Sequence, residues 1–191
     1  MSEHKLANDF KVTLDEAKSV IEMFYSSYPK LKKFFQKKIK ETLSTGYVLI
    51  DEITGRRSYG GNVYDTYLHS KAMIDMLKEQ GKKVPTKLWS EFFTAKGILE
   101  RMSQNYPIQG RAASMTKLAV VLMWEKIITN NAIGKVKIVN IVHDEIVIEM
   151  IDEFKDIAYV WIKDSMEHAG RVFCSKVNME VNPVISKQWE H

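Results

Sequence analysis

The chain has 191 residues, 45% of them hydrophobic, and a formal net charge of +4 at pH 7. This composition predicts a folded protein with its own core, and no apolar run approaches the ~20 residues that cross a bilayer, so we expect no membrane partner and a cytoplasmic location. The single cysteine, Cys174, excludes an internal disulfide and a cysteine-rich zinc site.

The N-terminal third predicts two helices. Thr13 and Glu16 have the spacing of a capping box, and apolar residues follow at helical spacing through Phe24. Tyr28-Pro29 interrupts this helix, and a second helix continues to about Leu43. That helix is rich in lysine, at Lys30, Lys32, Lys33, Lys37, Lys38 and Lys40. Such a run is typical of a solvated helix face, and it also suits contact with nucleic acid.

The middle of the chain predicts a small hairpin and then two helices. Residues 47–50 and 57–59 are β-prone and flank turn residues, which places Arg56 and Arg57 near the tip of the hairpin. The signal is weak over residues 60–85. A helix is then expected from about Leu88 to Tyr106, and Pro107 is expected to start a second, long helix toward residue 130.

The last third predicts a second hairpin, with His143, Asp144 and Glu145 at the turn between two β-rich runs. A helix over residues 154–166 and a final strand over residues 177–181 should follow. No repeat or linker marks a boundary, so we expect one structural unit over residues 1–191. The predicted fold class is α+β, with helices packed on a small antiparallel sheet.

The acids at the second hairpin are the clearest chemical feature. Carboxylates at a rigid strand turn suit Mg²⁺, which prefers oxygen ligands. A solvated surface turn is the other interpretation of this tripeptide. A metal-dependent hydrolase built on His143, Asp144 and Glu145 is a further hypothesis, although three adjacent residues alternate in direction and converge poorly on one ion.

A second candidate set is Arg101, Asn105 and Gln109, which are spaced by four residues each. On a helix this spacing places three long polar side chains on one face, where they could reach phosphates and the minor-groove edges of bases. An ordinary solvated face has the same pattern. Pro107 is expected to disturb the helix between Asn105 and Gln109.

Two segments together resemble a known family. Asn105-Tyr106-Pro107-Ile108-Gln109-Gly110-Arg111-Ala112-Ala113 resembles the Asn-x-Pro-x-Gln-Gly-Thr-Ala-Ala signature of family A DNA polymerases, the bacterial DNA polymerase I type, and Val142-His143-Asp144-Glu145 resembles motif C of that family. Further similar stretches are Tyr28-Pro29, Gly46-Tyr47, Gly55-Arg56-Arg57 and the terminal Trp189 and His191. The resemblance spans nearly the whole chain and keeps the order of the family.

The resemblance implies the C-terminal palm segment of a polymerase domain, with adjoining helices on the fingers side. It implies that Asp144 is a ligand of catalytic Mg²⁺, that Glu145 is a neighbouring carboxylate and metal ligand, and that His143 lies near the primer end. The DNA-binding set that it implies is Arg101, Asn105, Gln109, Arg56, Arg57 and Lys117. The expected partners are primer-template DNA and deoxynucleotide triphosphates, in replication or repair within a bacterial or phage-infected cell.

The chain also departs from the family. Arg111 stands where the family usually has Thr, and Ser114 where it usually has Asp. Motif A, with the other metal-binding Asp, and motif B, which binds the incoming nucleotide, are absent from residues 1–191. We therefore expect a two-metal site completed by a carboxylate outside this chain, little activity of the chain alone, and dependence on an upstream segment carrying both motifs.

Two functional hypotheses follow from these departures. In the first, the chain is one part of a polymerase, and the surface where the upstream part docks makes the isolated chain prone to self-associate. In the second, the chain is a non-catalytic nucleic-acid-binding module derived from a polymerase, whose working surface is the lysine-rich helix with Arg56 and Arg57.

Overall fold

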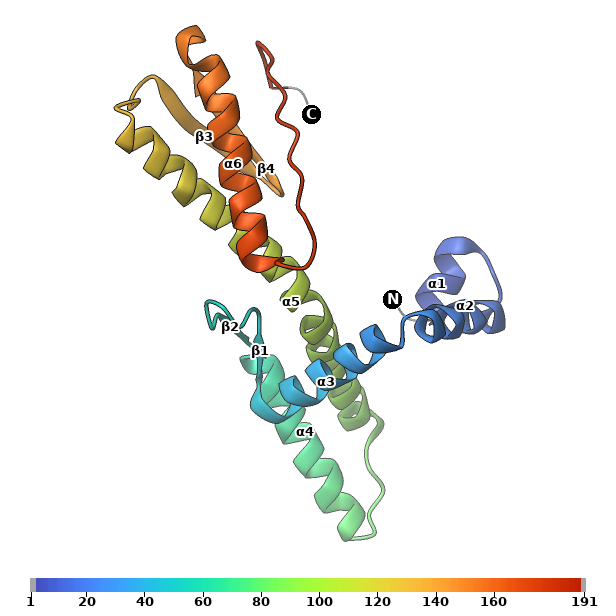
Figure 1. Ribbon diagram of the computed structural model, residues 1–191. Coiled ribbons are helices and arrows are strands. Elements are labelled where there is room, and N and C mark those ends of the chain that lie inside the picture. The colour runs from blue at the N-terminus through green and yellow to red at the C-terminus, as the bar shows by residue number, and fades with distance from the viewer. Residues whose placement is uncertain (1–2, 190–191) are drawn as a thin grey trace. The chain divides into compact units, whose positions relative to one another are not determined.

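A computed structural model describes residues 3–189 of the chain (Figure 1). His191, part of the family resemblance, lies outside these residues. The described residues form two compact units: the first contains residues up to 48 together with 58–104, and the second contains residues 49–57 together with those from 105 onward. That the whole chain acts as one structural unit of a polymerase domain stays a prediction. No helix within residues 3–189 is long and apolar enough to cross a membrane.

The first two helices of the first unit are α1 (Glu3–Phe10) and α2 (Leu14–Ser27). The predicted capping box begins α2. The Glu16 backbone N–H donates to the Thr13 hydroxyl at 3.2 Å, and the Thr13 backbone N–H donates to the Glu16 carboxylate at 2.8 Å. Two otherwise unsatisfied N–H groups are thus paired at the helix start. The Thr13 backbone N–H and the Thr13 hydroxyl, which also donates to this carboxylate at 2.8 Å, hold the pKa of Glu16 below its ordinary value.

Helix α3 (Pro29–Thr45) starts at the predicted proline and ends at Gly46, which has a φ of 78°. A side chain at Gly46 would be strained by this left-handed conformation, and its Cβ would lie 2.6 Å from the Tyr64 ring. Strands β1 (Tyr47–Leu49) and β2 (Arg57–Tyr59) follow and pair as the predicted small hairpin.

Helix α4 (Asn62–Glu79) lies within residues 60–85, for which no element was predicted. Its buried side chains are Tyr67, Ser70 and Ile74, so a polar residue interrupts the apolar stripe. The buried Ser70 is tolerated because its hydroxyl donates to the carbonyl of Thr66 at 2.7 Å. Around Tyr67, the core of this unit gathers Ala95, Leu99, Leu43, Val63, Tyr64, Phe92 and Met102.

Helix α5 (Thr86–Thr129) is continuous, and the predicted break at Pro107 is wrong. Proline lacks an N–H, so the Ser103 carbonyl loses its usual helical partner, and such a position ordinarily kinks or ends a helix. Here Pro107 is buried, and Arg56, which lies outside the helix, stabilises the following turn by donating to the carbonyl of Gly110. Tertiary contacts therefore override the local preference of proline.

The second unit packs α6 (Lys155–Phe173) and the end of α5 with the antiparallel strands β3 (Val136–Val142) and β4 (Glu145–Met150). A short 3₁₀ turn, η1 (Asp152–Phe154), leads into α6. The buried core is Met123, Ile127, Ala132, Val136, Ala158, Trp161 and Ile162, with Ile138, Ile146, Ile148 and Met150 packed against it. The α+β class with helices on small antiparallel sheets is therefore confirmed.

The predicted final strand is wrong. Residues 174–189 contain no strand, and the C-terminal segment, red in Figure 1, runs as extended chain beside α6. One residue of the predicted strand, Met179, packs against Gly170 of α6. A Cβ added at Gly170 would lie 2.6 Å from the Met179 Cβ. Val177 is 64% exposed and has no strand beside it with which to pair.

Candidate functional site

The β3–β4 turn carries the predicted catalytic tripeptide. Val142 and Glu145 form the last strand pair, so His143 and Asp144 are the two turn residues. His143 has a positive φ of 52°, which reverses the chain within two residues. All three polar residues are exposed. The predicted hairpin with acids at its tip is confirmed, and the catalytic roles of its residues stay predictions.

A strand register fixes where these acids project. The pairs Ile141–Ile146 and Ile138–Ile148 hold β3 against β4, and a β-bulge lies between Ile138 and Asn140. Ile146 and Ile148 pack on the core of the second unit. Because a slip of one residue would turn both isoleucines toward solvent, the core fixes the position of Asp144 at the turn.

Asp144 in the turn and Glu145 at the start of β4 are the residues of this hairpin end that could hold a metal ion. Their carboxylates are hard oxygen donors, which fits Mg²⁺ better than a softer metal. Within residues 3–189, however, no group of three or more His, Cys, Asp and Glu side chains comes together as a metal site. Among the described residues, these two carboxylates are therefore not joined by a third side chain of this kind.

The second predicted set lies on α5. Asn105 and Gln109 are exposed on the part of α5 that belongs to the second unit, as is Lys117 two turns further on. Arg101 is exposed on the part that belongs to the first unit. Because α5 is unbroken at Pro107, residues spaced by four along it, up to Gln109, lie on one face of the helix.

Sequence reasoning missed Asp51, a carboxylate that is 1% exposed in the loop between β1 and β2. Oδ1 accepts the backbone N–H of Thr54 at 2.7 Å, and the Thr54 hydroxyl lies 2.8 Å from both carboxylate oxygens. The Ser114 hydroxyl of α5 lies 3.2 Å from Oδ2. The Thr54 contacts hold the loop together, and the Ser114 contact joins it to the helix segment that carries Gln109.

The charge of Asp51 is stabilised where it lies. Burial raises the pKa of the carboxyl group, but the hydrogen bonds from Thr54, the Ser114 hydroxyl and the nearby Arg56 charge outweigh burial, so the pKa lies below its ordinary value. The carboxylate is therefore ionised at neutral pH. No motif points to it, because its partner on α5 is 63 residues away in sequence.

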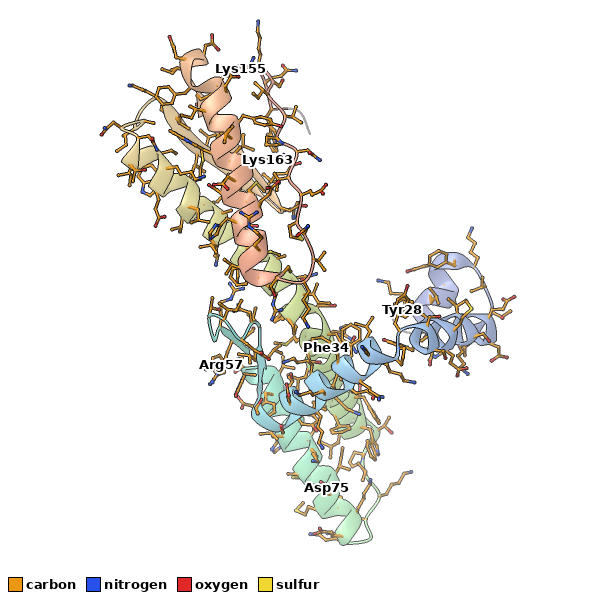
Figure 2. All side chains as sticks on the ribbon, viewed as in Figure 1. Tyr28, Phe34, Arg57, Asp75, Lys155 and Lys163 are labelled. Carbon is orange, nitrogen blue, oxygen red and sulfur yellow. The ribbon has the colours of Figure 1, made fainter. Side chains whose placement is uncertain are left out.

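The two arginines of this hairpin have different surroundings. Arg56 is half-buried and donates to the carbonyl of Gly110, so it helps to fasten the loop to α5. Arg57 is exposed at the start of β2 (Figure 2). Of the two arginines of this hairpin, Arg57 is thus the more exposed. Arg111, the other departure from the family pattern, is half-buried on α5.

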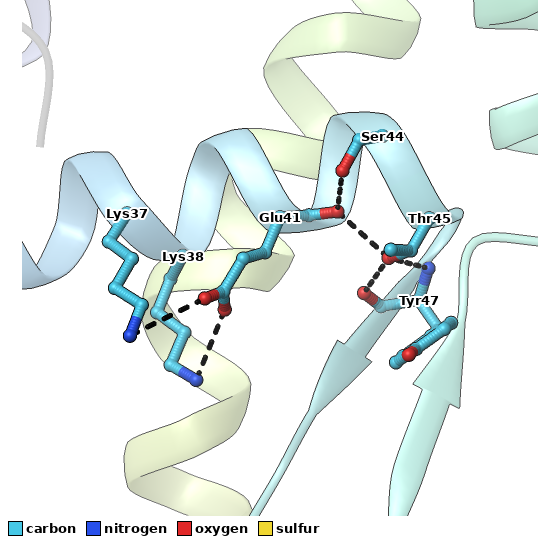
Figure 3. Close-up of polar contacts among 6 residues, drawn as sticks. All are labelled: Lys37, Lys38, Glu41, Ser44, Thr45 and Tyr47. Atoms are coloured by element: carbon cyan, nitrogen blue, oxygen red, sulfur yellow. Dashed lines mark hydrogen bonds and ion pairs between the residues drawn. The ribbon is translucent and has the colours of Figure 1, made fainter.

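The lysine-rich helix α3 is partly neutralised within its own turns. Lys37 and Lys38 form ion pairs with Glu41 at 3.7 and 3.4 Å (Figure 3). Lys32 lies over the Tyr25 ring, 5.9 Å from its centroid. The run is therefore not a uniform cationic surface, and its lysines differ in what they contact.

Comparison with known proteins identifies relatives over the whole chain. The family model described as DNA polymerase family A matches residues 1–191. DNA polymerase I of Caldicellulosiruptor bescii is 31% identical over 169 residues, covering 88% of this chain and 16% of that protein. The thermostable DNA polymerase I of Thermus aquaticus is 28% identical over 189 residues, covering 99% of this chain and 19% of that protein. The chain thus spans less than a fifth of the length of these two curated relatives.

The fold also matches a solved structure. The POL domain of Pol1 from M. smegmatis, in complex with DNA primer-template and dNTP, aligns with a TM-score of 0.64 and 22% sequence identity. The alignment covers 88% of this chain and 25% of that chain. This likeness supports the assignment of the fold.

Proposed function

Because the chain belongs to DNA polymerase family A, we propose that it forms the C-terminal part of a polymerase domain that adds deoxynucleotides to a primer on a DNA template. The observation that carries this proposal is the two-residue turn between β3 and β4, which presents Asp144 beside Glu145. The sequence around this turn resembles motif C. The core-fixed register keeps these carboxylates at the tip of the hairpin.

In this proposal, Asp144 is a ligand of Mg²⁺, Glu145 is a neighbouring carboxylate, and His143 lies near the primer end. Bound Mg²⁺ would neutralise charge on the phosphates and on the attacking and leaving oxygens. The contribution of the chain is to hold oxygen donors on a rigid turn before substrate arrives. A two-metal site needs more carboxylate ligands than this turn supplies.

The remaining ligands would come from an upstream segment carrying motifs A and B. The β3–β4 sheet has two strands, so each strand has an edge that no other described strand pairs. Near the turn, Val139 and Ile141 are 44% and 49% exposed. These edges and apolar side chains support docking of a further segment beside the hairpin, and self-association of the chain when that segment is absent.

Primer-template DNA would be bound by exposed polar side chains. Asn105 and Gln109 offer donors and acceptors to minor-groove edges, while Arg57 and Lys117 offer charges to phosphates. Arg101, exposed on the first unit, would also contact DNA. The M. smegmatis Pol1 domain of similar fold was solved with DNA primer-template and dNTP, which supports the same partners for this chain.

Complementation of primer extension tests the proposal. The 191-residue chain is mixed with a polypeptide carrying the upstream part of a family A polymerase domain, and Mg²⁺-dependent synthesis is measured on a primed template. We expect synthesis by the mixture and little by either part. Asp144→Asn should reduce it at least about 100-fold, since removal of a charge-stabilising group at a reaction centre costs 10²–10³ in rate.

Asp152→Asn, which removes an exposed acid elsewhere in the second unit, is the matched control and should leave synthesis unchanged. Synthesis that survives Asp144→Asn would refute the catalytic role. Duplex binding by the chain with no synthesis in any mixture would instead favour the non-catalytic nucleic-acid-binding module.

A further inference from the structure

A groove of about 470 Å³ lies on the first unit, lined by three helices. We call it the three-helix groove, and its lining residues are Gln36, Ile39, Lys40, Leu43, Ser44, Tyr67, Lys71, Lys96 and Glu100. Helix α3 supplies the first five, α4 the next two, and α5 the last two. All of them belong to the first unit, so the groove is built by one compact part of the chain.

One lysine from each helix meets at this groove: Lys40, Lys71 and Lys96. A single acid, Glu100, also lines it, and this acid pairs with Lys96 at 3.6 Å. Within residues 3–189, neither Lys40 nor Lys71 takes part in an ion pair. The lining therefore carries a net charge of about +2 from three lysines and one glutamate, and like charges gathered in a hollow attract anions.

Two other lysines of α3 do have an acidic partner on the same helix. On α3, Lys37 and Lys38 both form ion pairs with Glu41, drawn as dashed lines in Figure 3. Lys40 is two residues further along and lies on the groove, without such an acid. Lys40 thus differs from Lys37 and Lys38 in lining the groove without an acid beside it, and Lys71 of α4 lines the same groove without an ion pair.

Tyr67 adds an independent feature to this groove. Its side chain is 7% exposed, and its ring stacks on Tyr64 and Phe92 with centroid distances of 6.2 and 5.5 Å. No described residue bonds to its hydroxyl, which is not among the buried polar atoms without a partner, so the hydroxyl reaches solvent. The hydroxyl is left as a donor at a cationic groove. Ser44 offers less, because its hydroxyl already donates to the Glu41 carbonyl at 2.8 Å.

We propose that the three-helix groove binds phosphate groups of a nucleic-acid strand. Lys40 and Lys71 contact the phosphates, the Tyr67 hydroxyl donates to a phosphate oxygen, and Ile39 and Leu43 lie against sugar or base. Lysine, a point charge on a flexible stem, suits sequence-independent contact with a backbone. The choice of a strand over a free polyphosphate rests on the proposed function, whereas the phosphate chemistry rests on the groove itself.

Fluorescence anisotropy tests this site. It measures the affinity of the 191-residue chain for a labelled primer-template duplex with a single-stranded overhang, across a range of salt concentrations. The test variant is Lys40→Gln/Lys71→Gln. The matched control is Lys82→Gln/Lys83→Gln, which removes the same charge from exposed lysines of the same unit outside the groove. Circular dichroism melting shows whether each variant folds as the wild type does.

We expect the groove variant to lose about tenfold or more in duplex affinity and to reduce the salt slope by about 1 to 2, the signature of two lost phosphate contacts. The control should change affinity less than about threefold. Equal losses in both variants would mean that net charge alone is responsible, and would overturn the site. So would a wild-type chain that binds neither the duplex nor inorganic tripolyphosphate.

Tripolyphosphate separates the two sources of phosphate. A groove variant that keeps duplex affinity but loses tripolyphosphate binding would overturn the strand as ligand and assign a small polyphosphate. Tyr67→Phe removes only the hydroxyl and should weaken duplex binding about threefold with unchanged melting; unchanged affinity would overturn its role as a donor. Since these assays measure no synthesis, their failure is distinct from failure of the complementation assay.

Discussion

The hydroxyl oxygen of Ser114 on α5 lies 3.2 Å from Oδ2 of Asp51 in the β1–β2 loop. It also lies 3.1 Å from the Gly110 carbonyl oxygen, but one hydroxyl proton serves one acceptor at a time. Arg56 already donates to that carbonyl, and a carboxylate is the stronger acceptor, so the proton of Ser114 is directed to Asp51. The pair stabilises the contact between loop and helix inside the second unit.

Removal of either partner should destabilise the chain. Ser114→Ala should lower the free energy of unfolding by about 1 kcal/mol, and Asp51→Asn by about 1 to 3 kcal/mol, because each leaves buried polar groups without their full set of bonds. Urea unfolding followed by circular dichroism measures both. Ser175→Ala, at an exposed serine of the same unit, should be neutral. An unchanged Ser114→Ala protein would show that the contact contributes nothing.

The stability contribution of Asp51 should depend on pH. Its pKa is lower in the folded chain than its ordinary value, so the contribution is complete above the unfolded pKa of about 3.9 and is lost as the pH falls toward the folded pKa. The stability difference between wild type and Asp51→Asn should therefore be larger at pH 7 than at pH 3. Glu16 and Asp164, whose pKa values are also lowered, titrate equally in both proteins. A difference that grows toward acid would contradict the sign.

Two glycines of α5 should respond oppositely to alanine. A Cβ at Gly110 would overlap Ile50 and lie 3.3 Å from Nη2 of Arg56, so Gly110→Ala should destabilise the chain by about 1 to 3 kcal/mol. At Gly97 the nearest atom is Nη1 of Arg101 at 3.5 Å, so Gly97→Ala should stabilise by up to about 1 kcal/mol through helix propensity. Thermal unfolding of the two variants measures the contrast, and equal shifts would refute close packing of the loop on Gly110.

The turn at His143 should favour glycine over alanine. A positive φ of 52° is costly for any residue with a Cβ, so His143→Gly should be more stable than His143→Ala by about 1 kcal/mol. Comparing these two variants removes the effect of losing the imidazole, which both share. If thermal melting ranks alanine above glycine, the turn does not have this backbone conformation in solution.

The sequence predicted features with local signals and missed those that depend on distant contacts. The capping box at Thr13 and the hairpin around Asp144 were predicted correctly because spacing and alternation within a few residues specify them. Helix α4 was missed because the buried Ser70 interrupts its apolar stripe. The strand expected near Val177 was wrong because alternation alone supplies no partner strand.

The same division applies to the candidate site. Asn105, Gln109 and Asp144 were found from motif spacing, whereas Asp51 has no neighbouring signal and becomes visible only when α5 is folded beside the loop. A helix break was predicted at Pro107 because proline disfavours a helix interior. The turn after Pro107 is instead stabilised by Arg56, far earlier in the chain, which donates to the Gly110 carbonyl. These contacts could not be inferred from one sequence without its tertiary structure.

The β1–β2 loop has a consequence for the order of folding. Residues 49–57 belong to the second unit, yet nearly fifty residues of the first unit separate them from residue 105, where the second unit resumes. During synthesis, Asp51 leaves the ribosome long before Ser114 exists. Closing so long a loop is slow, because its entropy cost precedes the contacts it allows. The first unit is complete once residue 104 has been made, whereas the loop of the second unit has to wait for the part of α5 that carries Ser114.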